Sequence, residues 1–127
     1  MKAKRLLPQQ TLDRLSLDFE VGFFGAVAAS EPENLRVLEA LATAYTRSGR
    51  YEDALRIDRR LACLLPENPI AHYNVACSLS ILGRADESID ALEKAIALGY
   101  EDWKQLRKDP DLANVRNHQR FRTLVAK

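Results

Sequence analysis

The sequence predicts an all-α protein, a short array of helical hairpins stacked on one another, and three observations lead there. Its 127 residues are 46% hydrophobic and 29% charged with 5 Gly and 5 Pro, a composition typical of an ordered chain rather than a low-complexity one. Short motifs recur along the chain at one fixed displacement. Within each repeat, apolar residues recur at the i, i+3, i+4, i+7 spacing of an amphipathic helix.

Two pairs of short motifs set the period. Pro32-Glu33-Asn34 recurs as Pro66-Glu67-Asn68, and Gly49-Arg50 recurs as Gly83-Arg84, with the same displacement in both pairs. A fixed period of 34 residues is typical of solenoids, in which each unit buries its apolar face only against its neighbours.

Each full unit, 35–68 and 69–102, divides at its glycine into two predicted helices of about 14 residues. Gly49 and Gly83 are expected to end the first helix of each unit, because glycine adopts a left-handed conformation at least cost. Small residues are expected where helix axes approach closely. These are Ala42, Ala54, Ala76 and Ala95.

Partial units are expected at both ends. In the N-terminal segment, 1–34, residues 17–29 look like the second helix of an earlier unit, although Gly22 and Gly25 lower its helix propensity. The C-terminal segment, 103–127, is expected to cap the array.

The cap is predicted to contain three short elements. A helix over 103–108 is followed by a helix-start signal, with Asp109 as N-cap and Pro110 in the first position. Asn117 is then expected to cap a last helix that ends at about Ala126.

At these positions the sequence resembles the tetratricopeptide repeat family, whose 34-residue unit carries the pattern W-x2-L-G-x2-Y, then A-x3-F, then P. The first unit departs from it at Asp58, where an aromatic residue is usual, and the second at His72, where a large apolar residue is usual. The matching positions are Leu38, Leu41, Ala42, Tyr45, Ala54 and Pro66 in the first unit and Val75, Ala76 and Leu79 in the second.

The resemblance implies a right-handed superhelix whose first helices line a concave groove for a peptide or partner protein. The groove residues that it implies are Arg36, Glu39, Thr43, Arg47, Ile70, Tyr73, Asn74, Cys77, Ile81, Lys104, Arg107 and Lys108. Such a groove has mixed character and a basic C-terminal end, which suits an extended peptide.

One subgroup of the family grips acidic chain ends with a carboxylate clamp. Asn74, Lys104 and Lys108 match three of its positions, but Glu39 and Thr43 occupy the other two. Because the carboxylate of Glu39 would repel an acidic ligand, we do not expect a clamp.

The function expected is therefore that of a non-catalytic adaptor or scaffold that binds another protein. A hydrolase or metal protein is the weaker alternative, since the two histidines, His72 and His118, have no metal-ligand spacing and no phosphate loop occurs. No catalytic residue, metal or cofactor is expected, and Cys63 and Cys77 are expected to be reduced.

Nucleic-acid binding is a second alternative. The net charge is only +1, but residues 103–127 carry a net +5 against −5 over 21–102, and Arg120 and Arg122 flank Phe121. The competing interpretation is a solvated cap that complements the acidic middle of the array.

The sequence gives weaker indications of the compartment and the oligomeric state of the protein than of its fold. No apolar stretch follows the basic residues near Met1, and the longest apolar run, 21–29, is shorter than the ~20 residues of a spanning helix. A cytoplasmic protein that does not bind membranes is the expectation. A monomer is expected, the alternative being that Phe19, Phe23 or Phe24 pairs two chains.

Overall fold

The protein is all-α, as the sequence predicts. A computed structural model describes residues 7–126, and no strand occurs in that range. Residues 1–6, which include the basic start discussed above, and Lys127 of the basic segment lie outside the described range. The elements are α1 (Gln9–Ser30), α2 (Leu35–Arg47), α3 (Tyr51–Leu64), α4 (Pro69–Ile81), α5 (Ala85–Ala97), α6 (Trp103–Lys108), the 3-10 helix η1 (Pro110–Leu112) and α7 (Gln119–Val125).

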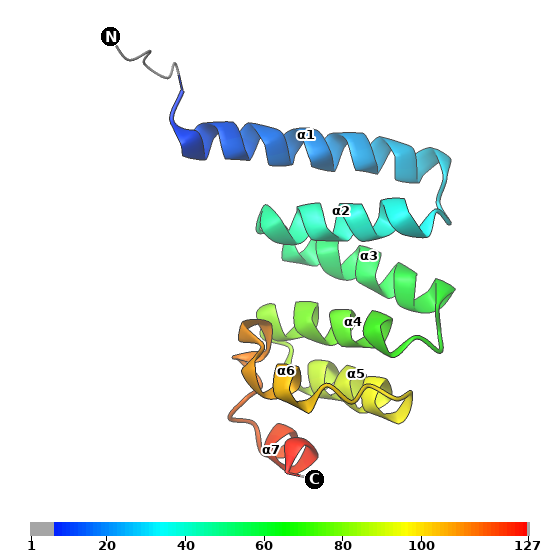
Figure 1. The fold of residues 1–127 in the computed structure, drawn as a ribbon, viewed down its shortest axis with the longest axis vertical. Helices are drawn as coiled ribbons and strands as arrows, with labels where there is room; N and C mark the ends of the chain where they lie inside the picture. The colour runs from blue at the N-terminus through cyan, green and yellow to red at the C-terminus, as the bar shows by residue number, and fades with distance from the viewer. Residues whose placement is uncertain (1–6, 127) are drawn as a thin grey trace.

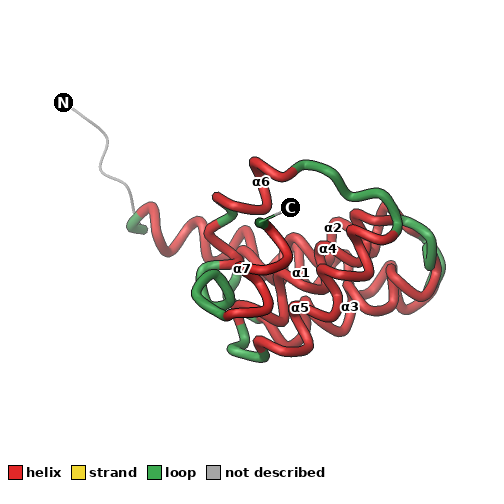
Figure 2. Tube along the Cα trace, turned by 90° about the horizontal axis from the view of Figure 1, so that it is seen from below, coloured by secondary structure: helices red, strands yellow, loops and turns green. Residues whose placement is uncertain are grey.

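The helices follow one another along the long axis of the molecule, from α1 at one end to α7 at the other (Figure 1). Each of α1 to α4 contacts the next helix in sequence, α2 with α3 and α4 with α5 forming tight hairpins. In the view along this axis, α2, α4 and α6 lie toward one side and α3 and α5 toward the other (Figure 2). None of the helices within residues 7–126 combines the length and apolar character needed to cross a membrane.

The backbone repeats with the period of the sequence at the hairpin turns. Gly49 and Gly83 both have φ +76°, the left-handed conformation expected for a glycine after a helix. The amide of Arg50 donates to the carbonyl of Tyr45 at 2.8 Å, and that of Arg84 donates to Leu79 at 2.9 Å. This bond satisfies a carbonyl that the end of the helix leaves without a partner.

The N-caps repeat with the same period. Asn34 caps α2, Asn68 caps α4 and Asp102 caps α6, each accepting a hydrogen bond from a backbone amide of the first turn. Because these three caps are equally spaced along the chain, α6 begins where the first helix of a further hairpin would begin.

The core follows the helix stack rather than forming one central cluster. One group of buried residues joins α2 and α3, with partly buried residues of α1 packed against it. Another joins α4, α5 and the C-terminal segment, and Leu55, Val75 and Leu79 link the two. Ala54, Ala76 and Ala95 are fully buried, and Ala42 nearly so, as predicted for close approach of helices.

Two boundaries differ from the prediction. Helix α1 begins at Gln9, well before residue 17, and has no buried residue. The last helix is capped by His118, not Asn117. Residues 113–117 form turns after η1, so the extended backbone that a cap requires comes at His118, whose Nδ1 accepts from the amide of Arg120 at 3.3 Å.

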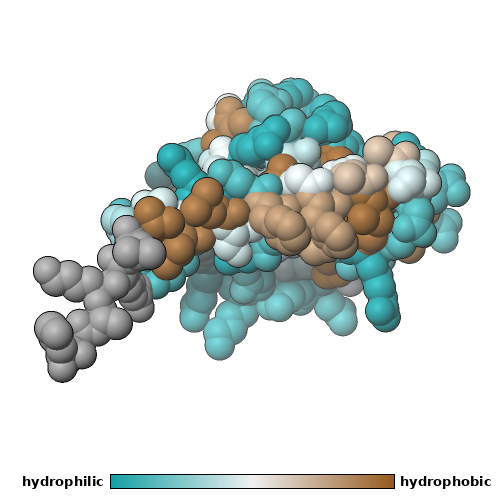
Figure 3. All heavy atoms as spheres, turned by 90° about the horizontal axis from the view of Figure 1, so that it is seen from above, coloured by the Kyte–Doolittle hydropathy of each residue, from teal (hydrophilic) through white to brown (hydrophobic). Residues whose placement is uncertain are grey.

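The outer face of α1 is apolar and exposed. Phe19 is 70% exposed and stacks on Phe23 with ring centroids 6.0 Å apart. Apolar side chains gather along α1 in the view onto this end of the molecule (Figure 3). The monomer stays a prediction, and so does the alternative in which this face pairs two chains.

Candidate partner-binding groove

A groove of about 510 Å³ runs across α2, α3 and α4 and reaches η1. Its walls combine apolar side chains with amides, hydroxyls and carboxylates. The residues that line it are Glu39, Ala42, Thr43, Thr46, Arg47, Asp58, Leu61, Leu65, Asn68, Ile70, Ala71, Asn74, Cys77, Ser78, Ile81 and Asp111.

Seven of the twelve predicted groove residues line this hollow. They are Glu39, Thr43, Arg47, Ile70, Asn74, Cys77 and Ile81. Arg36 instead lines a neighbouring hollow of about 410 Å³ between α1 and α2, which Glu39, Thr43 and Arg47 share. The first helices of the two units therefore do present these side chains to one continuous surface.

The other four predicted residues lie elsewhere. Lys104, Arg107 and Lys108 are exposed on α6 but do not line the groove, and Arg107 donates to the carbonyl of Val125 at 3.2 Å. The groove therefore ends at Asp111, not at a basic patch. The expected basic C-terminal end is not found because η1, and not α6, packs against α4 and brings Asp111 to this end of the groove.

Tyr73 is the clearest departure from the predicted set, because it is only 7% exposed. Its ring stacks on Tyr100 at 4.4 Å, and its hydroxyl donates to Oδ2 of Asp109. Burial, together with the neighbouring Asp109, raises the pKa of Tyr73, so the hydroxyl keeps its proton and acts as a donor. Tyr73 thus fastens the C-terminal segment to α4 and is closed to a partner.

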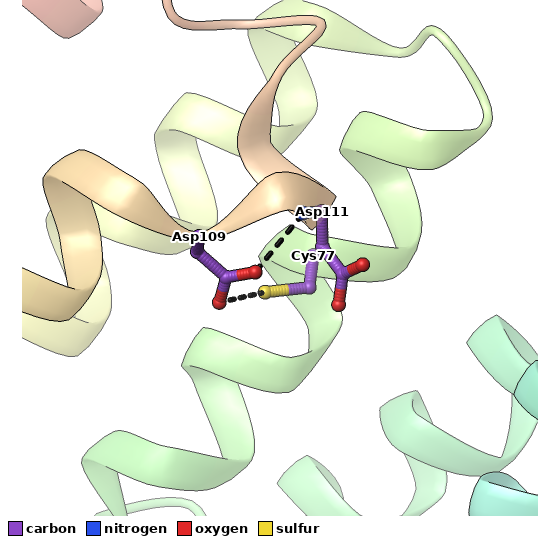
Figure 4. A group of neighbouring side chains, drawn as sticks. All are labelled: Cys77, Asp109 and Asp111. Atoms are coloured by element: carbon purple, nitrogen blue, oxygen red, sulfur yellow. Dashed lines mark hydrogen bonds between the residues drawn. The ribbon is translucent and has the colours of Figure 1, made fainter.

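Asp109 is the centre of this closure, and Figure 4 shows its carboxylate beside Cys77 and Asp111. Besides Tyr73, its carboxylate accepts from Gln105 Nε2 at 3.1 Å and from the amide of Asp111 at 3.0 Å. Its backbone carbonyl accepts from Arg116 at 2.6 Å. The carboxylate is therefore both the N-cap of η1 and the point where three segments meet.

Cys77, Asp109 and Asp111 are the group within residues 7–126 whose ligand atoms lie close enough to hold a metal ion, all within 4.8 Å of one another. Their chemistry fits a metal poorly. Burial and the carboxylates of Asp109 and Asp111 raise the pKa of Cys77, so the thiol is protonated and a weak ligand. Asp109 already accepts hydrogen bonds at both oxygens.

Asp58 is a groove residue that the sequence analysis noted only as a departure from the family pattern. It belongs to α3, is 6% exposed, and accepts a hydrogen bond from Ser78 Oγ at 2.7 Å across the α3–α4 contact. Burial raises its pKa from 3.8 to about 6, and the bond from Ser78 partly opposes this rise. A charged residue at a position that is normally apolar was the signal in the sequence.

The basic C-terminal segment is largely engaged by the chain itself. Arg120 pairs with Asp90 at 2.6 Å, Glu93 at 3.0 Å and Asp86 at 3.5 Å, all on α5. Phe121 is 2% exposed, so its ring is not available to stack on a base. These contacts agree with a cap that complements the acidic middle of the array.

Comparison with known proteins adds a likeness to a plant protein. No family model matches the chain. The chain is 38% identical over 87 residues to a protein of Arabidopsis thaliana whose name describes it as chloroplastic. The match covers 64% of this chain and 25% of the plant protein, so the chain spans about a quarter of the length of that relative.

Proposed function

We propose that this protein is a non-catalytic interaction module of the tetratricopeptide type, which holds a segment of another protein in the groove across α2, α3 and α4. Its role is that of an adaptor or scaffold. The observation that carries the proposal is the groove itself, an open hollow to which successive first helices contribute side chains at matching positions.

The repeated geometry supports the assignment to the tetratricopeptide type. Hairpin turns with the same glycine conformation recur at the period of the sequence, and so do the asparagine caps of α2 and α4. In this proposal α1 is the second helix of a partial unit and α6 is the first helix of the next, so that four units contribute to one solenoid.

The composition of the groove wall suits an extended peptide. Asn74 is exposed and its amide can both donate to and accept from a peptide backbone. Ile70 is 53% exposed and offers an apolar contact for a side chain, and Thr43 adds a hydroxyl. Backbone pairing gives affinity and the side-chain contacts give selectivity.

The two histidines have structural roles that fit the non-catalytic proposal. His72 Nε2 contacts the carbonyl of Pro66 at 2.8 Å, and His118 caps α7. The compartment stays a prediction. The sequence favours the cytoplasm, while the name of the plant relative places that protein in the chloroplast.

A photo-crosslinking amino acid in place of Thr43, inside the groove, tests the proposal against the same amino acid in place of Glu93, on α5 outside it. The groove position is expected to capture partners from cell lysate that the outer position does not. The combined changes Ile70→Ala and Asn74→Ala should abolish that capture while circular dichroism shows an intact fold. Equal capture at both positions would argue against the groove.

A further inference from the structure

The groove contains a buried carboxylate without a positive partner. Asp58 lies at the contact of α3 and α4, nine-tenths buried, and its Oδ2 accepts from Ser78. Within residues 7–126 no donor is bonded to its Oδ1, and no ion pair includes Asp58. Buried carboxylates are normally paired with a cation or fully hydrogen-bonded, because an isolated buried charge is costly.

The other charged groups of the groove do not supply that cation. Arg47 is the basic residue in the lining, and its Nη1 lies 3.6 Å from Glu20 on α1. Asp111 lies at the opposite end of the groove, where burial and Asp109 raise its pKa. Glu39 adds a third carboxylate, on α2.

Asp58 and Asp111 both line the groove, and so does Cys77 of α4. Both carboxylates contribute to the raised pKa of Cys77. Leu61, Leu65 and Ala71 contribute apolar surface to the same groove. A groove that combines apolar walls with carboxylates, of which Asp58 is buried, matches a side chain with a long aliphatic stem and a cationic head.

We propose that the groove selects a partner segment carrying a lysine or arginine side chain, whose cationic head pairs with Asp58 while Asp111 adds attraction from the end of the groove. This inference rests on the proposed function, since it names the chemistry of the partner at the same site. It also differs from the expectation from sequence, in which the C-terminal end of the groove was basic.

Three short fluorescent peptides test the inference. They alternate serine, leucine and one variable position, which is lysine, glutamine or glutamate. Fluorescence polarisation is expected to show the lysine peptide binding at least about tenfold more tightly than the glutamine peptide, because a desolvated charge pair forms. The glutamate peptide should bind most weakly.

Variants locate the charge that matters. Asp58→Asn keeps the acceptor for Ser78 but removes the charge, and it should bring the lysine peptide down to the affinity of the glutamine peptide. Asp111→Asn should lower the affinity for the lysine peptide several-fold. This variant replaces Asp58→Asn in the test if Asp58→Asn does not fold. The matched control is Asp53→Asn, also on α3, whose carboxylate is already paired with Arg50 and Arg56 and which should leave binding unchanged.

The outcomes separate this inference from the proposed function. Equal affinity for the lysine and glutamine peptides, preference for glutamate, or an equal loss in Asp53→Asn would overturn the cationic anchor. If a peptide still bound and Asn74→Ala weakened it, the groove would stand without that anchor. Failure of all three peptides to bind would count against both.

Discussion

The hydroxyl of Tyr73 on α4 donates to the carboxylate of Asp109, 36 residues further along the chain. This bond is one of the contacts that join the second hairpin to the C-terminal segment, whose Asp111 lines the groove. It turns a residue whose repeat position would place it on the binding surface into part of the core.

Loss of this bond should loosen the C-terminal segment. Tyr73→Phe keeps the stacked ring but removes the donor, and we expect a loss of about 1–3 kcal/mol, the range for a hydrogen bond to a charged acceptor. Urea denaturation measures the loss, and amide exchange should accelerate most over residues 103–125. Tyr51→Phe is the control, because the hydroxyl of Tyr51 makes no hydrogen bond within residues 7–126. Equal losses in both variants would contradict the assignment.

Asp58 should make the protein less stable as pH rises. Its pKa is about 6 in the folded state and 3.8 as a free side chain, so the folded state holds the proton more tightly. Stability is therefore fullest below pH 4 for this group and falls between about pH 4 and 6. Two pKa units correspond to roughly 3 kcal/mol, an upper figure for the loss.

Asp58→Asn is accordingly expected to stabilise the protein at pH 7 and to match the wild type near pH 4. Urea denaturation of both chains across this pH range measures the difference. Asp53→Asn, on the same helix, is the control and should show no such gain. A variant less stable than the wild type at pH 7 would show that the charge of Asp58 is satisfied within the chain.

Replacing a turn glycine with alanine should lower the stability of the protein, whereas replacing a glycine within a helix should raise it. Gly83→Ala forces a side chain into φ +76°, although the space around it is open, so the cost of about 1 kcal/mol is backbone strain alone. Gly22→Ala, in the middle of α1 and also in open space, should gain up to about 1 kcal/mol. Thermal unfolding compares the two. The same sign in both would contradict the turn geometry.

The contacts of Arg120 should matter mainly at low salt. Arg120→Ala removes pairs with Asp86, Asp90 and Glu93, which are exposed and therefore screened by ions. We expect a lower Tm than that of the wild type in dilute buffer, with the gap closing as salt is added. Arg122→Ala should show no salt-dependent gap, because within residues 7–126 the guanidinium of Arg122 bonds to the neutral Gln119 and to no carboxylate. A gap unaffected by salt would point to lost packing instead.

Local signals in the sequence predicted most of the helices. Gly83 as a turn residue acts through its own backbone conformation, so the residue type is enough to locate the end of α4. The all-α class and the buried alanines followed in the same way. The cap of α7 was misplaced by one residue because Asn117 and His118 can both accept a hydrogen bond, and the preceding turns decide between them.

The site was predicted only in part, because its limits depend on contacts between distant segments. Glu39 and Asn74 line one groove, an arrangement that follows from the period and helix geometry. The period could not show that Asp109 would accept a hydrogen bond from Tyr73, nor that no cation within residues 7–126 pairs with Asp58. Those outcomes depend on how the C-terminal segment crosses α4.

The neighbour-to-neighbour stacking of α1 to α5 has a mechanical consequence. Because α1 packs against α2 at the end of the stack and has no buried residue, whereas α3 contacts both α2 and α4, opening of the chain is expected to start at α1 and proceed inward one helix at a time. Local stability is therefore expected to be highest at the centre of the stack and lowest at α1, the blue end in Figure 1.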